Sequence, residues 1–391
     1  MHRPRPFDIV HVSSAHPWTD NRVHLRAAAA ASEVGYRTAL IAVATDEQPD
    51  RDWSVPDPRT GVYVRRLRRR ARSRRVLVST VEAVAAALSS RARIVHLHDP
   101  ELLWALPFLR LAGRTVVYDA HEDLPAQVLG KEYLGAIARR LVTLLAHALV
   151  LLGGRADAVI AATPAIAGRF PAERTTIVRN FPVVGDGVEL ARLTARPRRA
   201  VYLGALSRDR GLGVLTEVAM SDELAPEWSI ATAGSIDGAV DRRAFDRATS
   251  AGRLEHSGVL APEAARAMLT ECRVGLVPLS PTPAYATSIP TKLFEYMAAG
   301  LAIIATDVPF WRELLDGVDC VTWVPPGDPR AVSAALDAYD ADDSLLERHG
   351  ANGQAAVRTR FRWEAERHQL LAAYSTLGLR DPLILAATND I

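Results

Sequence analysis

The stretch Pro290–Gly300, Pro-Thr-Lys-Leu-Phe-Glu-Tyr-Met-Ala-Ala-Gly, has the residue types and spacing of a ligand-binding helix. Pro290 suits a helix start because its missing N–H is not needed there, and Gly300 suits the position just past a helix end. Lys292 and Glu295 are three apart and share one face. They could form a surface ion pair. Alternatively, the free N–H groups of the first turn and the Lys292 ammonium could bind an anion, with Glu295 roughly 4.5 Å further along the axis.

A second corner in the same half of the chain has similar chemistry. Residues 201–212 form a predicted strand, a glycine, a polar loop with Arg208 and Arg210, and Gly211 at the start of a helix. A helix N-terminus beside an arginine can bind a phosphate. Two such corners and one carboxylate match a nucleoside diphosphate, whose ribose hydroxyls are natural donors to Glu295.

His256 follows a predicted strand and has two interpretations. It could pack near the same nucleotide, or it could be a hydrogen-bonded structural histidine. The chain lacks a phosphate-binding loop ending in Gly-Lys-Ser/Thr, and Gly211-Leu212-Gly213 lacks the third glycine of a dinucleotide fingerprint. Asp50-Arg51-Asp52 has an acidic spacing that a divalent cation could use, but it lies in a Pro-rich loop without other ligands. The acidic stretch Asp337–Asp343 lacks the glycine and terminal glutamate of a calcium loop, so we assign no metal and no cofactor.

The elements that must position these residues follow one pattern along the chain. Short β-branched runs alternate with Ala-rich helical segments, which predicts parallel strands joined by crossover helices. The pattern stops at a Pro-, Gly- and charge-rich stretch, 181–199, and then restarts. We therefore predict an α/β chain of two doubly wound Rossmann-like domains, 1–180 and 200–360, facing across a cleft and joined by the linker 181–199. Ligands in such sheets bind at the carboxyl ends of the strands. The predicted strands are Phe7–Ser13, Thr38–Ala44, Ile94–His98, Thr115–Asp119, Ala158–Ala162, Thr176–Val178, Ala200–Leu203, Trp228–Ala233, Arg253–Ser257, Val274–Pro278, Leu301–Ala305 and Val321–Val324.

Length and composition agree with two soluble domains. The chain has 391 residues, 49% of them hydrophobic and 24% charged, too many for one ordinary core. Its two cysteines, Cys272 and Cys320, give no disulfide framework. Residues 1–10 have no long apolar stretch of a secretion signal. These features predict a cytoplasmic protein.

Two segments could bring the protein to a membrane. Residues 65–75 hold eight arginines, which could face anionic lipid or form a solvated loop and the start of a helix. Because no aromatic residues are interleaved with them, we do not expect nucleic acid as a partner. The apolar run Leu141–Leu152 is too short to span a bilayer and is expected to be a buried helix or one that leans on a membrane. We therefore expect peripheral contact with an anionic membrane at its inner face.

Four stretches together resemble one family. Pro290–Gly300 followed by an apolar strand resembles the donor-binding signature of family 4 glycosyltransferases, which are retaining enzymes of GT-B architecture. Tyr118–Asp123 resembles the strand-end His segment of the family's N-terminal domain, and Gly204–Gly211 resembles its phosphate loop. Phe361-Arg362-Trp363 resembles the start of its C-terminal helix, so residues 361–391 are expected to pack back toward the N-terminal domain.

The resemblance implies roles on the donor side. Arg210 stands where the family usually has a phosphate-binding lysine, in the loop from Gly204 to Gly211. Lys292 would share the diphosphate, and Glu295 would hold the ribose. His256 is included as a donor-side residue.

Two donor-side positions depart from the family pattern. Ala205 replaces the usual arginine of the phosphate loop, and Arg208 is expected to supply that charge instead. Thr287 occupies the position of the glutamate that contacts the donor sugar in relatives.

On the acceptor side, the resemblance places His121 near the transferred sugar and the acceptor, with Glu122 beside it. Asp20 and Asn21 lie in the first loop, where many relatives have paired glycines. The implied catalytic set is His121, Lys292 and Arg210.

The resulting hypothesis is transfer of a sugar from a nucleoside-diphosphate sugar to a polysaccharide, lipid-linked or glycoconjugate acceptor, with retention implied by the resemblance. Fixed cations and helix N–H groups would stabilise the leaving phosphate, so no Mg²⁺ is required. Two alternatives stay open. One is a sugar-nucleotide-binding protein without transfer activity, and the other is a sugar-nucleotide epimerase of the same fold.

Overall fold

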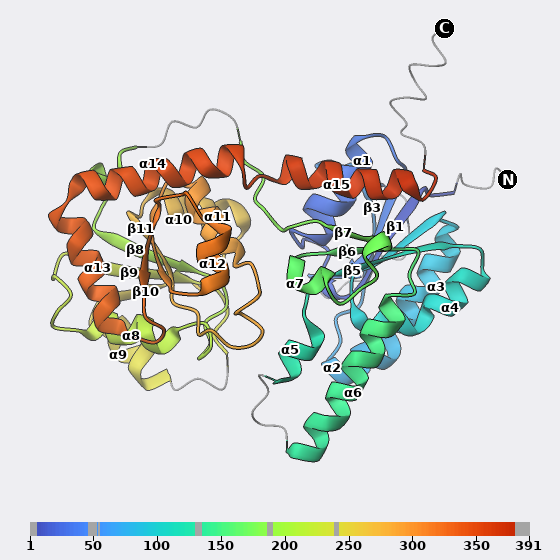
Figure 1. Ribbon diagram of the computed structural model, residues 1–391, viewed down its shortest axis with the longest axis horizontal. Coiled ribbons are helices and arrows are strands. Elements are labelled where there is room, and N and C mark those ends of the chain that lie inside the picture. Colours follow the sequence, from blue (N-terminus) through green and yellow to red (C-terminus); the bar gives the residue numbers. More distant parts are fainter. Residues whose placement is uncertain are drawn as a thin grey trace, which may run out of the picture. The chain divides into compact units, whose positions relative to one another are not determined.

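The computed structural model describes residues 6–45, 53, 55–129, 135–185, 191–237 and 242–379. The chain forms two compact units, which are distinguished in Figure 1. Unit 1 comprises Met1–Asn180 and Trp363–Ile391, and unit 2 comprises Phe181–Arg362. The stretch expected as a linker therefore belongs to unit 2, because Phe181 and Leu193 are buried in its core.

Unit 1 is built on one parallel sheet. Within its described residues, the sheet has seven strands in the order β3-β2-β1-β4-β5-β6-β7. The order in which successive strands are added to the sheet switches from one side to the other between β1 and β4. Open α/β sheets bind ligands at such a switch point. The strands are β1 (Ile9–Pro17), β2 (Thr38–Val43), β3 (Tyr63–Leu67), β4 (Ile94–Leu97), β5 (Thr115–Ala120), β6 (Ala158–Ala161) and β7 (Thr175–Ile177).

Unit 2 repeats this arrangement. Its described strands form a parallel six-stranded sheet in the order β10-β9-β8-β11-β12-β13, with the reversal between β8 and β11. The expected fold class, α/β with two Rossmann-like units, is confirmed. The strands are β8 (Arg199–Leu203), β9 (Ser229–Ala233), β10 (Leu254–His256), β11 (Val274–Val277), β12 (Ala302–Thr306) and β13 (Val321–Val324).

Helices and short helical turns connect the strands. Those of unit 1 are η1 (Val23–Ala28), α1 (Ala29–Glu33), α2 (Arg72–Arg74), η2 (Arg75–Ser79), α3 (Thr80–Ser90), η3 (Pro100–Ala105), α4 (Leu106–Leu111), α5 (Leu124–Leu129), α6 (Ala136–Gly153), α7 (Pro164–Ala167), η4 (Ala172–Arg174) and α15 (Trp363–Thr376). Those of unit 2 are η5 (Leu193–Ala195), α8 (Leu212–Met220), α9 (Arg242–Ser250), α10 (Pro262–Thr270), α11 (Thr291–Ala298), α12 (Pro309–Leu314), α13 (Pro329–Ala341) and α14 (Asp343–Thr359).

The final helix, α15, is part of the unit 1 core. Its residues Trp363, Leu370 and Tyr374 are buried in one cluster with Ile9 of β1 and Ile94 of β4. Residues 380–391, the rest of the expected C-terminal element, lie outside the described part of the chain. The last helix therefore completes the sheet face formed by the first half of the sequence.

Two sequence expectations about unit 1 were wrong in part. Tyr63–Leu67 forms the edge strand β3, so the arginine run begins in a strand and not in a loop, while its later residues do begin a helical segment at Arg72. Basic residues suit an edge strand because they discourage pairing with other chains. The run Leu141–Leu152 lies in α6, which is not a buried helix: Leu141, Leu144 and Leu151 are about 60 to 70% exposed. The alternative of a helix that leans on a membrane stays a prediction.

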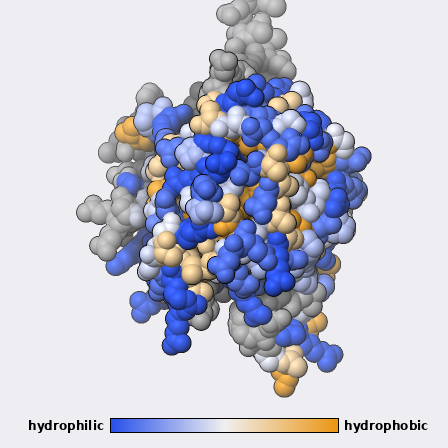
Figure 2. Space-filling view, turned by 90° about the vertical axis from the view of Figure 1, so that its left-hand side faces the viewer, coloured by the Kyte–Doolittle hydropathy of each residue, from blue (hydrophilic) through white to orange (hydrophobic). Residues whose placement is uncertain are grey.

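Helix α6 stands out among the described helices. By length and composition alone it could cross a membrane, yet only 11% of this 18-residue window is buried. The outer face of unit 2, over α13 and α14, is by contrast mainly hydrophilic with scattered apolar residues (Figure 2). Most of the exposed large hydrophobic residues in the described structure belong to unit 1, and only Val183, Met220 and Val259 belong to unit 2.

Candidate functional site

Helix α11 is positioned by its buried face. Tyr296 accepts a hydrogen bond on its hydroxyl oxygen from the backbone N–H of Leu203, 2.9 Å away at the end of β8. The Tyr296 ring lies against Gly275, where an added Cβ would come within 2.2 Å of it. A glycine in β11 is therefore required for α11 to pack on the sheet. This packing places Lys292, in the first turn, at the carboxyl end of β8.

The Lys292 side chain is buried without an anionic partner. The residue is only 9% exposed, and its Nζ lies 3.8 Å from the centroid of the Tyr202 ring. Burial lowers the pKa of Lys292 to about 7, and the nearby charge of Arg210 acts in the same direction. Among the described residues, no carboxylate forms an ion pair with Lys292, so the surface ion pair with Glu295 is wrong.

The identity of this side chain is also informative. The chain has only two lysines, Lys131 and Lys292, and otherwise uses arginine as its basic residue. An added Cβ at Gly204 would lie 3.4 Å from Lys292 Nζ, so the ammonium occupies a confined space. A compact ammonium fits there, whereas a planar guanidinium is larger and keeps its charge when buried.

The loop after β8 holds Arg210 beside this lysine. Arg210 donates a hydrogen bond from Nε to the hydroxyl of Tyr285 at 3.1 Å, and no carboxylate pairs with it in the described structure. Gly211 begins the helix α8 with φ +82°, and an added Cβ would lie 2.2 Å from the carbonyl oxygen of Pro278. Only glycine fits at that position. The structure thus brings Gly204, Arg210 and Lys292 together.

Other donor-side residues have weaker structural support. Glu295 is half-buried and forms no hydrogen bond or ion pair with any described residue. Thr287 is half-buried in the turn that carries Tyr285, and Arg208 is exposed. Relatives have an arginine at the position of Ala205, and Arg208 was expected to supply that charge. Because Arg208 is exposed, it does not place a buried guanidinium there.

His256 is placed apart from these cations. Its Nδ1 lies 3.1 Å from Thr232 Oγ1, and its ring packs edge-on against Phe245. No described hydrogen bond, ion pair or ring contact joins His256 to Lys292 or Arg210. These contacts favour the structural interpretation of this histidine.

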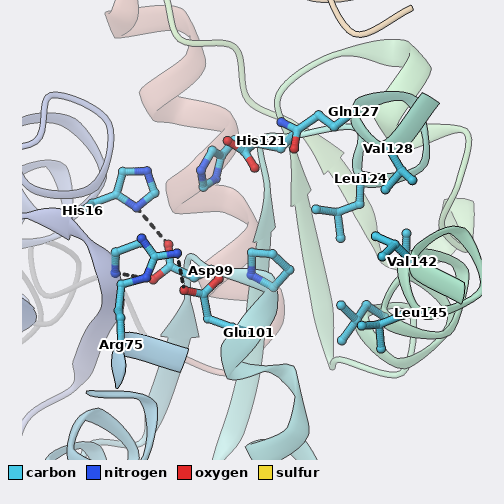
Figure 3. Close-up of a pocket in the computed structure, with 15 residues that line it drawn as sticks. His16, Arg75, Asp99, Glu101, His121, Leu124, Gln127, Val128, Val142 and Leu145 are labelled. Carbon is cyan, nitrogen blue, oxygen red and sulfur yellow. Dashed lines mark hydrogen bonds and ion pairs between the residues drawn. The ribbon is translucent and has the colours of Figure 1, made fainter. Parts of the chain in front are cut away.

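Unit 1 has a pocket of about 340 Å³ at the carboxyl ends of its strands (Figure 3). One wall is polar and the opposite wall is apolar. His121 and Glu122, both predicted acceptor-side residues, line it. The polar wall includes His16, Arg75, Asp99 and Glu101, and the apolar wall includes Leu124, Val128, Val142 and Leu145.

His16 and Asp99 form a charged pair in the polar wall. His16 Nδ1 lies 2.9 Å from Asp99 Oδ1. The other oxygen of Asp99 accepts hydrogen bonds from the backbone N–H groups of Ser14 and Ala15, at 2.5 and 3.1 Å. Burial alone lowers the pKa of His16, but the hydrogen bond and charge of Asp99 outweigh it and raise the pKa to about 9. Burial opposes the ionisation of Asp99, yet these contacts hold its pKa well below the usual range.

Asp119 connects His121 to the interior of unit 1. It accepts hydrogen bonds from Arg22 Nη2 at 2.6 Å and lies 2.8 Å from His98 Nδ1. His121 Nδ1 is 3.6 Å from Asp119 Oδ2, and its ring lies edge-on to that of His16 with centroids 5.1 Å apart. His121 Nδ1 is also 3.3 Å from the backbone carbonyl oxygen of Asp119, so the predicted histidine is held by the Asp119 backbone and lies near a carboxylate that Arg22 neutralises.

Two predicted acceptor-side residues have a different place. Asp20 accepts hydrogen bonds from the backbone N–H groups of Arg22 and Val23, both at 2.8 Å, so its carboxylate caps the turn η1. Asn21 is exposed, and neither residue lines the pocket. An aspartate before a helical segment is a common cap, so these contacts give Asp20 a local structural role, and its place on the acceptor side stays a prediction.

The polar residues of this wall were not predicted from the sequence. Asp99 and Glu101 come just after the predicted strand Ile94–His98, and His16 comes just after the predicted strand Phe7–Ser13, within the longer observed strand β1. The rule that ligands bind after the strands at the point of reversal could have identified them.

Comparison with known proteins agrees with this geometry. Residues 197–342 match the family model described as "Glycosyl transferases group 1". The phosphatidyl-myo-inositol mannosyltransferase of Mycobacterium leprae (strain TN) is 37% identical over 86 residues, which are 22% of this chain and 23% of that protein. The lipopolysaccharide core biosynthesis mannosyltransferase LpcC of Rhizobium leguminosarum bv. viciae is 32% identical over 83 residues, 21% of this chain and 24% of that protein. The matched stretch thus spans about a quarter of these relatives' length.

Solved structures share the fold along nearly the whole chain. Sucrose-phosphate synthase from Thermosynechococcus elongatus has a TM-score of 0.72 at 20% identity, covering 94% of this chain and 98% of that one. The Anabaena protein HepE, solved in complex with UDP-glucose, has a TM-score of 0.70 at 15% identity, covering 95% of this chain and all of that one (100%). The chain therefore has the two-unit fold of these proteins, and its residues 197–342 match the family model of group 1 glycosyltransferases.

Proposed function

We propose that the chain transfers a glycosyl group from a nucleoside-diphosphate sugar, bound at Lys292 and Arg210 of unit 2, to a hydroxyl group of an acceptor bound in the unit 1 pocket. The observation that carries this proposal is the buried Lys292 ammonium, which has no anionic partner among the described residues. A buried cation without a counter-charge is costly. A bound diphosphate would supply the missing negative charge.

The donor would be bound at two places, its diphosphate and its ribose. Lys292, Arg210 and the N–H groups at the start of α8 and α11 face the phosphates in this proposal. The free Glu295 carboxylate, in the second turn of α11, accepts hydrogen bonds from the ribose hydroxyls. Thr287 and the nearby loop contact the sugar, with a neutral hydroxyl in place of a carboxylate.

The chemistry follows from the charge that develops in the reaction. Breaking the glycosidic bond places negative charge on the leaving phosphate. Cationic side chains that are already in position stabilise that charge without a metal ion. The transfer therefore requires no metal in our proposal. Retention would follow if the acceptor attacks from the face that the phosphate leaves, with the phosphate taking the acceptor proton.

The acceptor is proposed to be amphiphilic, such as a lipid-linked glycan or polyol. The pocket has a polar wall around His16 and Glu101 and an apolar wall from α5 and α6. The relative from Mycobacterium leprae carries phosphatidyl-myo-inositol in its name, which is an acceptor of this class. His121 would lie nearest the reacting hydroxyl.

Exposed apolar residues near the pocket support contact with a membrane. Leu141 and Leu145 of α6 are 62% and 58% exposed, and Leu77, just after the arginine run, is 73% exposed. Cations beside apolar side chains suit the surface of an anionic bilayer. We propose a cytoplasmic protein that binds such a membrane peripherally.

A transfer assay tests the function and separates it from the alternatives. The purified chain is incubated with UDP- and GDP-linked mannose and glucose, with and without amphiphilic acceptors, and nucleoside diphosphate and products are measured. If the chain transfers sugar, the release of nucleoside diphosphate should depend on the acceptor. This release should be lost in Lys292→Met and kept in Arg266→Gln, which changes an exposed residue of α10. Binding without release would support a binding protein, and an isomerised sugar without acceptor would support an epimerase.

Membrane contact needs a separate measurement. The protein is expected to co-sediment with anionic liposomes at low salt, and Leu141→Ser with Leu145→Ser should weaken this. Equal sedimentation with neutral and anionic liposomes, or none with either, would reject peripheral binding through this surface.

A further inference from the structure

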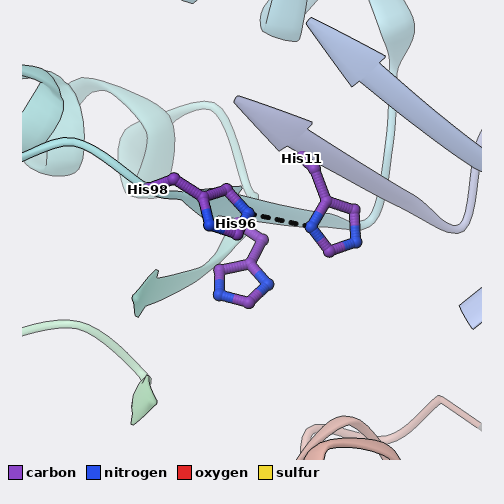
Figure 4. A group of neighbouring side chains, drawn as sticks. All are labelled: His11, His96 and His98. Carbon is purple, nitrogen blue, oxygen red and sulfur yellow. Dashed lines mark hydrogen bonds between the residues drawn. The ribbon is translucent and has the colours of Figure 1, made fainter. Parts of the chain in front are cut away.

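Three histidines meet in the interior of unit 1 where the chain order of its sheet reverses. His11 lies on β1, and His96 and His98 lie on or just after β4. His11 is directly opposite His96 in the strand register, and His98 follows two residues later, so all three point to the same face. Figure 4 shows the three rings gathered together. All three residues are fully buried, at 0% exposure. Neither the fold nor the proposed transfer explains them.

Two ring nitrogens of this group have no partner. His11 Nε2 and His96 Nε2 are buried and form no hydrogen bond with any described residue. A buried polar atom without a partner is costly and rare in folded proteins. Two of them on adjacent histidines indicate a site that is incomplete.

The remaining nitrogens are held by fixed partners. His98 Nδ1 lies 2.8 Å from the Asp119 carboxylate, so it carries the proton and leaves a lone pair on Nε2. That Nε2 is 2.9 Å from His11 Nδ1. His96 Nδ1 is 2.7 Å from the hydroxyl of Tyr374 on α15. If His96 Nδ1 donates to that hydroxyl, its Nε2 also presents a lone pair.

We propose that His11, His96 and His98 bind one divalent transition-metal ion of the zinc type, at a site separate from the donor site. Three imidazoles are a common ligand set for Zn²⁺, with water in the fourth position. The carboxylate of Asp119 and the hydroxyl of Tyr374 supply the outer hydrogen bonds that orient metal-bound histidines.

The geometry is close to that of a metal site. One ligand atom from each histidine can be chosen so that all lie within 4.8 Å of one another. Nitrogens around tetrahedral Zn²⁺ lie roughly 3.4 Å apart when each Zn–N bond is about 2.1 Å. His11 Nδ1 and His98 Nε2 are 2.9 Å apart, so an ion bound by these two atoms would replace the hydrogen bond that joins them, and His96 approaches by rotation of its side chain.

The ion would join elements that are distant in sequence. His11 and His96 belong to neighbouring strands, and Tyr374 is 278 residues away from His96 on the last helix. Binding would therefore stabilise the attachment of α15 to the sheet. Because the site is buried, the ion would enter during folding rather than exchange freely afterwards.

Metal content is measured on the untagged full-length chain, produced with zinc in the medium and also refolded with Zn²⁺ or Co²⁺ after chelation. We expect about one ion per chain, resistant to chelators until the protein unfolds, and visible Co²⁺ absorption typical of nitrogen ligands. His96→Gln should lose the ion and the absorption. His368→Gln, an exposed histidine on α15, is the matched control and should keep both.

A second variant guards against a folding failure in His96→Gln. Tyr374→Phe removes one outer hydroxyl and keeps the ring, and it should lower metal affinity about 10- to 100-fold in a chelator competition. The proposal is overturned if the folded or refolded wild-type chain retains less than about a tenth of an equivalent. It is also overturned if His96→Gln and wild type hold equal metal. Loss of the transfer activity alone would not bear on it, since the readout is the bound ion.

Discussion

The pocket of unit 1 and the cationic site of unit 2 differ in whether their buried charges are paired. In unit 1, each buried carboxylate near the pocket has a cationic partner: Asp99 has His16, and Asp119 has Arg22. In unit 2, Lys292 and Arg210 have no carboxylate partner among the described residues, and Lys292 is held instead over a tyrosine ring. The first site is neutralised by the protein itself, and the second is not.

This difference indicates what each site is built to bind. A site with unpaired buried cations gains most from an anionic ligand, because the ligand removes a desolvation cost that the protein otherwise carries. A site whose charges are already paired gains little from another charge but holds its hydrogen-bonding groups in fixed positions. It suits an uncharged hydroxyl group that must be oriented. Substitutions should therefore affect stability in unit 1 and binding in unit 2.

The largest effect is expected for Asp119→Asn in unit 1. This change leaves the Arg22 guanidinium, 11% exposed, without its buried counter-charge and removes the acceptor of His98. Losing one partner of a buried pair costs about 3 to 5 kcal/mol of unfolding free energy. Urea denaturation of metal-free protein measures it. Asp307→Asn breaks the exposed pair with Arg312 and should cost less than about 1 kcal/mol. Equal losses in the two variants would contradict the contrast between buried and exposed pairs.

Lys292→Met should have the next largest effect, on binding rather than on stability. Removing a cation at the leaving phosphate is expected to lower transfer about 10²- to 10³-fold. The fold should be at least as stable at pH 7, since a buried cation is removed. Calorimetry with the nucleoside diphosphate and urea denaturation test both parts. A variant that binds as well as wild type would reject Lys292 as a phosphate ligand.

The same lysine predicts a pH dependence in the wild type. Its pKa of about 7 means that the free protein loses the ammonium as pH rises above 7. Since the diphosphate requires the charged form, affinity should fall above pH 7, approaching tenfold for each further pH unit. Lys292→Met should remove this dependence, because no titrating ammonium is left at the site. A flat profile in wild type between pH 6 and 9 would argue that another group dominates.

The residues proposed to bind the donor were grouped from the sequence more completely than the residues that line the unit 1 pocket, for a physical reason. Lys292 and Glu295 lie within one helical turn, so local spacing alone places them on one face, and Gly204 and Gly211 mark the loop beside them. The pocket depends on residues from several strands: His16, Asp99 and His121 are far apart in sequence and meet only through the parallel sheet. Local patterns do not report such meetings.

Other misassignments have the same origin. The strand β3 was missed because its arginines hide the alternation, while its pairing with β2 is a tertiary feature. The exposure of α6 was missed because its apolar composition is also that of a buried helix. Twelve of the thirteen strands in the described structure were nevertheless anticipated from short apolar runs, because buried parallel strands are continuous in hydrophobicity.

Glu295→Gln should produce a smaller effect that separates ribose from phosphate binding. The amide accepts a weaker hydrogen bond from the ribose hydroxyls than the carboxylate, which predicts roughly a tenfold loss of affinity for a nucleoside diphosphate. Affinity for inorganic pyrophosphate should be unchanged, since it has no ribose. Calorimetric titration with both ligands measures the difference. If pyrophosphate binding falls equally, the carboxylate acts on the phosphate site instead.

The smallest effect concerns the His16–Asp99 pair and is visible only through pH. The pKa of His16 is raised to about 9, so the pair's contribution is complete below the unfolded value of 6.5 and is lost as pH rises through 9. His16→Gln keeps a donor to Asp99 but no charge, and should cost about 1 kcal/mol at pH 6. The difference between wild type and variant should shrink toward zero above pH 9. Urea denaturation at pH 6, 8 and 10 measures it, with His147→Gln, an exposed histidine on α6, as control. A difference that stays constant with pH would mean that shape, rather than the charge on His16, holds this wall of the pocket.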